Sequence, residues 1–202
     1  DVAPNGSSMC YTGSSTSIII PQFVYSGGTI YPVAVIQGGS FVSTTSSITS
    51  VKISMNIEKI VMEASSSQFA FGLANLSTVI VDNNNTTFSD INNSCIINNV
   101  SELIVGTGDT KITGVTAIGD GAFMNNTKLT SITIPKIVKT IGKMAFSGCS
   151  NLGKVTFDDA KATWTVVDSE DLVSGDSVTV DDATSNASML TVKYAEKYWY
   201  TK

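Results

Sequence analysis

Hydrophobic and polar residues follow the same order in four short segments of the chain. Each segment has apolar residues at its first, fourth and sixth positions and mostly polar residues between them. Alternation at the last three positions is the period of a β-strand, whose successive side chains point to opposite faces. We therefore expect four strands, which we call rungs, with the second, third and fifth side chains facing outward. The rungs are residues 48–53, 76–81, 129–134 and 152–157.

The last two rungs belong to segments that superimpose at a spacing of 23 residues. Ile118-Gly-Asp-Gly-Ala-Phe123 recurs as Ile141-Gly-Lys-Met-Ala-Phe146, and a rung follows each copy. A unit this short cannot bury its own apolar face, so its copies must stack around one continuous core. The period predicts a solenoid, with the rungs at 51–53, 79–81, 132–134 and 155–157 as neighbouring parallel strands.

A phenylalanine lies five to seven residues before each rung, which predicts a second buried ladder behind the strands. An earlier partial unit runs from Ile18-Ile-Ile20 through a hairpin-like insertion at 26–29 to Val35-Ile36, and it is the expected start of the array. The phenylalanines of the ladder are Phe41, Phe71, Phe123 and Phe146.

Two segments depart from the period. Residues 82–117 hold Asn-rich turn formers around Cys95-Ile-Ile97 and Leu103-Ile-Val105, which we interpret as a strand pair inserted into one repeat. After Phe157, residues 163–167 and 177–180 are predicted as short strands. Ala187, Leu190, Tyr194 and Tyr198 then follow helical spacing, with Ser185 or Asn186 as the N-cap. We expect residues 1–17 to form an N-terminal segment or cap, 18–157 the repeats, and 158–202 a C-terminal cap.

Composition narrows the function classes. The net charge is −5, the cations are all lysine and histidine is absent, so a nucleic-acid partner is not expected. The lack of histidine also removes Ser-His-Asp and Cys-His catalytic groups and the usual zinc ligand sets. No apolar run reaches the length of a membrane-spanning segment, so none is expected, and we expect any signal peptide or anchor to have been removed.

The three cysteines are far apart and include no Cys-x-x-Cys pair, which argues against a metal site or a disulfide framework. One bridge with one free thiol is the alternative to three packed thiols. We expect Cys149 to be a buried free thiol, because the equivalent residue one repeat earlier is Asn126. Cys10 is expected to react first.

The repeat resembles the BspA-like leucine-rich repeat, found in surface proteins of bacteria and mucosal protozoa. Ile141, Gly142, Ala145, Phe146, Cys149 and Leu152 match the pattern, as do Ile118, Gly119, Ala122, Phe123, Leu129, Ile132, Ile134 and Pro135, with Asn126 in place of the cysteine. The repeat at 48–71 departs from it, since Ala64-Ser-Ser-Ser67 replaces the expected Ile-Gly.

The resemblance implies a β-rich α/β solenoid, a right-handed superhelix shaped as a partial horseshoe. It further implies a secreted or cell-surface protein that binds an extracellular protein or glycan, through adhesion or host-protein binding, without catalysis or a cofactor. The alternative is a carbohydrate-binding or structural envelope protein, which exposed Trp or Tyr platforms would favour. Here the candidates for such platforms are Trp164, Tyr198, Trp199 and Tyr200, which a cap explains equally well.

The outward positions of the rungs stack into one stripe, and in solenoids a concave stripe of this kind is often the binding face. The alternative is that strand propensity alone places threonine there. The candidate binding residues are Thr49, Ser50, Lys52, Ser77, Thr78, Ile80, Thr130, Ser131, Thr133, Lys154 and Thr156, with Gly153 completing the last rung.

Acidic residues offer two further possibilities. Asp168, Glu170, Asp171, Asp181 and Asp182 could bind calcium, but they lack the ligand spacing and turn glycine of an EF-hand loop, so we expect a solvated loop. Distant carboxylates can also converge into a glycosidase pair. No strand-end acid marks such a pair, so we do not expect an enzyme.

Overall fold

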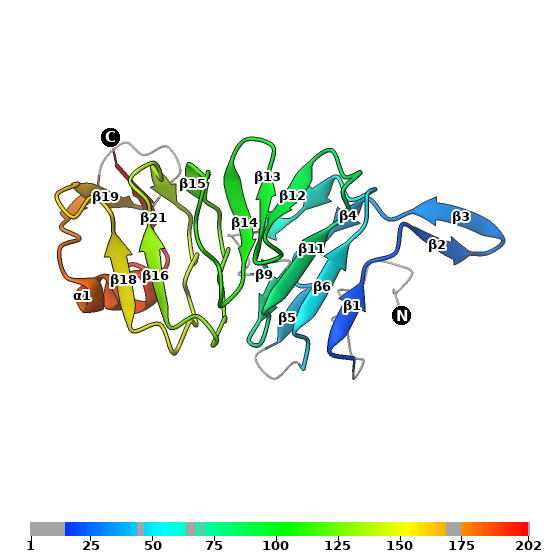
Figure 1. Ribbon diagram of the computed structural model, residues 1–202, viewed down its shortest axis with the longest axis horizontal. Helices are drawn as coiled ribbons and strands as arrows, with labels where there is room; N and C mark the ends of the chain where they lie inside the picture. Colours follow the sequence, from blue (N-terminus) through cyan, green and yellow to red (C-terminus); the bar gives the residue numbers. More distant parts are fainter. Residues whose placement is uncertain (1–14, 44–46, 64–67, 70, 169–174, 202) are drawn as a thin grey trace.

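The computed structural model describes residues 15–43, 47–63, 68, 69, 71–168 and 175–201. Over these residues the chain is an elongated β-solenoid, with strands of successive coils stacked along its long axis (Figure 1). Within the described part, helix is confined to α1 (Ala183–Ser188) and the π-helical turn η1 (Met189–Lys193). The predicted solenoid is confirmed, and its coils consist of strands and turns with little helix.

The rungs form parallel strands in two separate sheets. β1 (Ser17–Ile19), β6 (Ser50–Ile53) and β11 (Thr78–Val81) make the first sheet. β16 (Ser131–Ile134) and β18 (Lys154–Phe157) make the second. The expectation of four neighbouring strands is wrong at one junction, because the inserted segment 82–117 lies between β11 and β16.

The inserted segment satisfies the free edge of β11. The Val79 N–H donates to the carbonyl oxygen of Asn93 over 2.9 Å, and the Val81 N–H donates to the Asp90 carboxylate over 2.9 Å. Asp90 lies in the inserted strand β12 (Phe88–Ile91), and Asn93 lies in the turn that follows it, in which Asn92 and Asn93 have φ of 52° and 55°. With these backbone donors satisfied, the first rung sheet ends at β11.

A second row of strands closes the solenoid on its other side. β4 (Val35–Ile36) pairs in parallel with β7 (Lys59–Ile60). The rest of this row is one mixed sheet, in which the predicted inserted pair is present as β13 (Cys95–Asn98) and β14 (Glu102–Gly106), with β12 (Phe88–Ile91) as a third antiparallel strand. In spatial order this sheet is β12 (Phe88–Ile91), β13 (Cys95–Asn98), β14 (Glu102–Gly106), β15 (Ala117–Ile118), β17 (Thr140–Ile141), β21 (Tyr198–Tyr200), β19 (Trp164–Val167) and β20 (Asp176–Val178).

Strand pairing corrects the alignment of the second repeat. Ile36 of β4 lies opposite Ile60 of β7, just as Ile118 lies opposite Ile141. Ile60 is therefore the repeat isoleucine, whereas residues 64–67, where we looked for it, lie outside the described residues. A short hairpin of β8 (Met62–Glu63) and β9 (Gln68–Phe69) separates Ile60 from Phe71.

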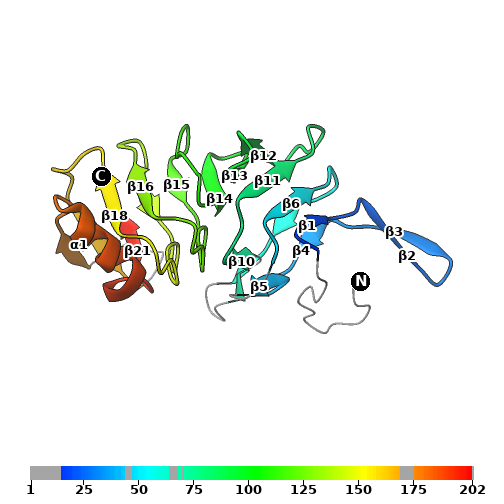
Figure 2. The ribbon, with the colours of Figure 1, turned by 60° about the horizontal axis from the view of Figure 1, so that its bottom comes forward.

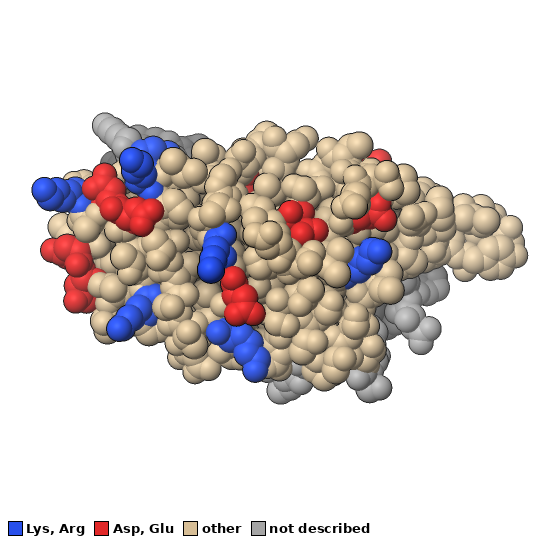
Figure 3. All heavy atoms as spheres, in the orientation of Figure 1, with Lys and Arg blue, Asp and Glu red and all other residues tan. Residues whose placement is uncertain are grey.

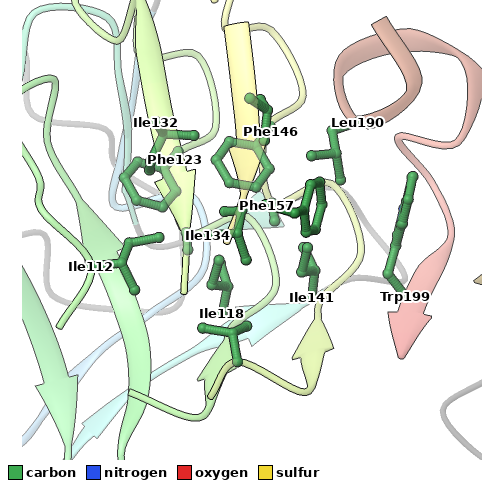
Figure 4. Packing of buried hydrophobic residues seen from close by; sticks show 14 of the residues in the cluster. Ile112, Ile118, Phe123, Ile132, Ile134, Ile141, Phe146, Phe157, Leu190 and Trp199 are labelled. Atoms are coloured by element: carbon green, nitrogen blue, oxygen red, sulfur yellow. The ribbon is translucent and has the colours of Figure 1, made fainter. Parts of the chain in front are cut away.

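The predicted phenylalanine ladder is present as two stacked pairs, although Phe41 is half-buried rather than buried. Phe41 and Phe71, from the parallel strands β5 (Phe41–Ser43) and β10 (Phe71–Leu73), have ring centroids 5.2 Å apart and planes inclined by 8°. Phe123 and Phe146 are 5.0 Å apart, inclined by 6° and buried (Figure 4). Gly106 of the inserted segment faces Phe123, and a Cβ there would lie 2.0 Å from the ring. Glycine thus makes room for the first ring of the second pair.

The repeat glycine after the isoleucine is required by close packing between coils. A Cβ on Gly142 would lie 2.4 Å from Asp120 Oδ1 and 2.5 Å from the Asp120 backbone nitrogen. Real Cβ atoms do not approach other atoms so closely, so the preceding coil would have to move. The Ile-Gly motif therefore reflects packing: the isoleucine side chain fills the core, and the glycine lets the backbone lie close to the preceding coil.

The C-terminal segment differs in detail from its prediction. The N-cap of α1 is Asp182, whose carboxylate accepts the Ser185 N–H over 2.5 Å, rather than Ser185 or Asn186. Asn186 is instead buried and donates to the carbonyl oxygens of Val155 and Val180. Tyr198 is not helical, because it lies in β21, which pairs with β17 and β19. The helix ends before the segment turns back as a strand.

Candidate binding surfaces

The outward residues of the rungs form the surface that we call the rung face. The first, fourth and sixth side chains of every rung are buried, from 0% exposure for Val51, Val79 and Val155 to 7% for Leu152. The outward side chains are all partly or fully exposed. The inward and outward positions are therefore as expected at all four rungs.

Register brings the rung-face residues together in two groups. Ser50 lies beside Thr78 and Lys52 beside Ile80 in the first sheet. In the second sheet Ser131 lies beside Lys154 and Thr133 beside Thr156. The first group also contains Ile19, which pairs with Lys52 and is 69% exposed. Ile19 was not predicted as a rung-face residue, because β1 belongs to a partial unit without the full six-residue pattern.

Two residues of the predicted stripe have a structural use. The Thr49 hydroxyl donates to the Thr16 carbonyl oxygen, and the Ser77 hydroxyl donates to the Thr49 carbonyl oxygen, each over 3.1 Å. These bonds tie successive coils together. In the second sheet, by contrast, the hydroxyls of Ser131, Thr133 and Thr156 make no hydrogen bond to the described residues. The second sheet thus offers the freer polar groups.

Charge is sparse on this side of the molecule. Lys52 and Lys154 are the charged members of the rung face, and both are exposed. The view of Figure 3, which has the orientation of Figure 1, shows scattered lysine and acidic side chains separated by broad uncharged surface. Recognition there would depend on hydrogen bonds and shape more than on a strong field.

The second row of strands carries a groove that sequence reasoning missed. It has a volume of about 640 Å³ and extends from β7 across β14, β15 and β17 to β21. Gly119 and Gly142, whose backbone packs against neighbouring coils, line it. Glu102 and Tyr198 also line it. The outward glycine of the Ile-Gly motif was the signal that could have found this groove.

The carboxylates in the groove are held by neighbouring groups. Glu102 Oε2 accepts a hydrogen bond from Asn98 Nδ2 over 2.8 Å. Asp120 Oδ1 accepts the Lys143 N–H over 2.7 Å. The groove can therefore contact a polar ligand with oriented oxygen atoms, but these two carboxylates already serve to connect strands.

The acidic residues near the C-terminus do not form a cation site within the described part of the chain. Lys197 forms an ion pair with Asp168. The hydrogen bond from Lys197 is the main cause that holds the pKa of the Asp168 carboxyl below its usual value, and the lysine charge lowers it further. Asp182 caps α1. Glu170 and Asp171 lie outside the described residues. The solvated-loop interpretation stays a prediction.

The two described cysteines are buried free thiols. Burial raises the pKa of Cys95 to about 11 and that of Cys149 to about 12. The prediction for Cys149 is confirmed, and a bridge between these two cysteines is ruled out. Cys10, which we expected to react first, lies outside the described residues.

The tail aromatics pack inward. Trp164 and Trp199 are 2% and 1% exposed, and their rings meet edge to face with centroids 6.5 Å apart. Tyr198 and Tyr200 are half-buried. The tryptophans of the tail therefore offer no platform on which a sugar could stack. Neither helix in the described residues has the length and hydrophobicity needed to cross a membrane.

Comparison with known proteins identifies the repeat. Residues 116–165 match the family model described as "BspA type Leucine rich repeat region (6 copies)". The resemblance drawn from the sequence is confirmed by this match. A search of curated proteins gives no match.

Three solved structures are similar to this chain. The first is a leucine-rich repeat protein from Eubacterium ventriosum, with 24% identity, a TM-score of 0.42, and coverage of 70% of this chain and 41% of its own. A leucine rich cell surface protein from Faecalibacterium prausnitzii has 23% identity, a TM-score of 0.35, and coverage of 85% and 55%. The pneumococcal vaccine antigen PcpA has 11% identity, a TM-score of 0.37, and coverage of 71% and 60%. This chain thus spans between 41% and 60% of their lengths.

Proposed function

We propose that this chain, whose residues 116–165 are a BspA-type leucine-rich repeat region, is an extracellular or cell-surface protein-interaction module that acts in adhesion without catalysis. The observation that carries the proposal is the rung face. Repetition places short hydroxyl side chains and two lysines in register on the exposed side of a buried apolar ladder. A surface of this kind suits a protein partner that presents hydrogen-bonding backbone and polar side chains.

The rung face supports weak individual contacts. Thr49 and Ser77 are partly engaged in holding coils together, so Thr78, Ser131 and Lys154 are the best placed to reach a partner. Few charges steer the encounter, and affinity per site should be modest. Many copies on one surface would supply useful adhesion, because linked sites raise avidity without new contacts.

Carbohydrate binding is the second candidate, supported by the groove beside Tyr198 with its oriented carboxylates. An aromatic ring next to hydrogen-bond acceptors is a common arrangement for holding a sugar. Against it, the tail tryptophans are buried. We therefore rank a protein partner first.

Retention of chain-coated beads on an extracellular-matrix extract separates the two candidates. The matrix is treated beforehand with protease or with periodate, which destroys glycan rings and spares most of the polypeptide. The proposal predicts that protease abolishes retention and periodate leaves it. Loss of retention after periodate treatment would instead favour binding of a glycan in the groove. A glycan array with the soluble chain provides the matching positive test.

A further inference from the structure

A two-stranded hairpin projects from the N-terminal end of the solenoid (Figures 1 and 2). Its strands, β2 (Phe23–Ser26) and β3 (Thr29–Pro32), pair with each other and with no other described strand. Gly27 and Gly28 make the turn, with φ of 56° and 84°. An isolated hairpin is marginally stable in water and ordinarily needs another layer over its apolar side.

The hairpin has an apolar face that nothing in the described structure covers. Phe23 lies opposite Pro32 and Tyr25 lies opposite Ile30, and residues directly opposed across two strands share a face. Phe23, Tyr25 and Ile30 are 52%, 75% and 65% exposed. Contiguous exposed apolar side chains of this size mark an interaction surface. We call Phe23, Tyr25, Ile30 and Pro32 the hairpin face.

Charge distribution indicates what covers the hairpin face. Residues 2–51 contain no Asp, Glu, Lys or Arg, so the net charge of −5 comes from Asp1 and from the chain beyond residue 51. Figure 3 accordingly shows the projecting end without charged side chains. A lipid surface is disfavoured, because this end has none of the basic residues that add attraction to anionic headgroups, and those headgroups repel an acidic chain.

A second copy of the chain meets no such repulsion at this point. In a two-fold contact each residue faces the same surface of its partner, so an uncharged face meets an uncharged face. The acidic residues of both copies then lie away from the contact. We propose that the hairpin face is a homodimer interface, in which the hairpins of two copies pack face to face around Tyr25 and Ile30.

The dimer goes beyond the proposed binding function and does not depend on it. The hairpin lies at the N-terminal end of the solenoid, whereas the second rung sheet lies toward the other end (Figure 1). Joining two copies through their hairpins leaves the second rung sheet of each copy exposed. The paired molecule would present two rung faces and gain avidity on any surface with repeated targets.

Sedimentation equilibrium of the full chain tests the interface. Across about 1 μM to about 300 μM, the range of weak protein dimers, the parent should change from monomer to dimer. The double variant Tyr25→Ser/Ile30→Ser should raise the dissociation constant at least about tenfold, since hydrophobic anchors dominate such contacts. The matched control Val100→Ser/Val192→Ser removes apolar residues that are 70% and 76% exposed elsewhere, and it should dimerise like the parent.

A further variant guards against a folding artefact. Ile30→Lys leaves the hairpin turn intact but sets like charges against each other across the two-fold axis. It should weaken the dimer at low salt and recover partly at high salt, because screening shortens the range of the repulsion. A misfolded hairpin would give no such recovery.

Three outcomes would overturn the proposal. The first is a parent that stays monomeric throughout the concentration range. The second is a control variant that loses the dimer to the same extent as Tyr25→Ser/Ile30→Ser. The third is flotation of the parent with phosphatidylcholine vesicles that is lost in the Tyr25→Ser/Ile30→Ser variant, since the hairpin face would then belong to a lipid surface.

Discussion

The thiol of Cys149 donates a hydrogen bond to the carbonyl oxygen of Phe123 over 2.9 Å and so links two successive coils. One repeat earlier the same position is Asn126, whose amide donates to the Leu76 carbonyl oxygen over 3.3 Å. Asn126 Oδ1 also accepts the N–H groups of Lys128 and Leu129. Both residues are buried donors that tie a turn to the preceding coil, which explains how two different side chains serve one repeat position.

We predict that replacing Phe146 by alanine lowers the free energy of unfolding by about 3–5 kcal/mol, the usual cost of emptying a packed aromatic site. Phe146 is 0% exposed and stacks on Phe123. Urea denaturation measures the loss. Val192→Ala, at a residue 76% exposed, is the control and should change stability by less than about 0.5 kcal/mol. Equal effects of the two substitutions would contradict a ladder that supports the core.

Two glycines test the packing account of the Ile-Gly motif. Gly142→Ala should destabilise the chain by about 1–3 kcal/mol, because the new Cβ would lie 2.4 Å from Asp120 Oδ1 and the coil must shift. Gly153 has no atom within 4 Å of a built Cβ. Gly153→Ala should therefore be neutral or stabilising by up to about 1 kcal/mol. Thermal melting of both variants decides the point, and a Gly142→Ala protein as stable as the parent would refute it.

The buried thiols predict a loss of stability in alkali. Burial raises the pKa of Cys149 to about 12, whereas an unfolded thiol keeps a pKa of about 9. The folded chain therefore holds this proton more tightly than the unfolded chain. Its contribution is complete below about pH 9 and declines as pH rises toward 12.

Comparison with the Cys149→Ala variant isolates the pH-dependent contribution of the Cys149 thiol to stability. The variant should start from a lower stability and show a shallower decline between pH 9 and pH 12. Urea midpoints recorded at several pH values provide the measurement. In the native protein at neutral pH, Cys149 should react slowly with a thiol reagent. Rapid labelling would show that the thiol is accessible, and identical slopes for parent and variant would show that folding does not raise its pKa.

The periodic part of the fold could be predicted because the signal is local. Each rung alternates along the strand, and Phe123 and Phe146 recur at the same spacing, so inward positions followed from the sequence. The groove was missed because it depends on residues as far apart as Glu58 and Trp199, which only the coiling of the chain brings together. The hairpin face was missed because alternation does not reveal whether a strand has a covering layer.

The predictions that were wrong have a common physical cause. In each case hydrogen bonding between separate segments overrides the local sequence pattern. Tyr198 fits a helical spacing, but backbone pairing of β21 with β17 and β19 places it in a strand. The order of the rungs in the sequence predicted one sheet containing all four of them. It divides because Asp90 and Asn93 bind the N–H groups that another strand would have used.

Adhesion by a triple variant of the rung face tests the central claim most directly. Thr78→Glu, Ser131→Glu and Lys154→Glu add negative charge to three outward positions and leave the buried ladder unchanged. Thr184→Glu, Ser188→Glu and Lys161→Glu make the same change of charge at three exposed positions of the C-terminal segment. Retention of beads coated with each protein on extracellular-matrix extract is compared once both variants melt like the parent. The account predicts that the rung-face variant loses retention while the C-terminal variant keeps it, and a folded rung-face variant that adheres as well as the parent would contradict it.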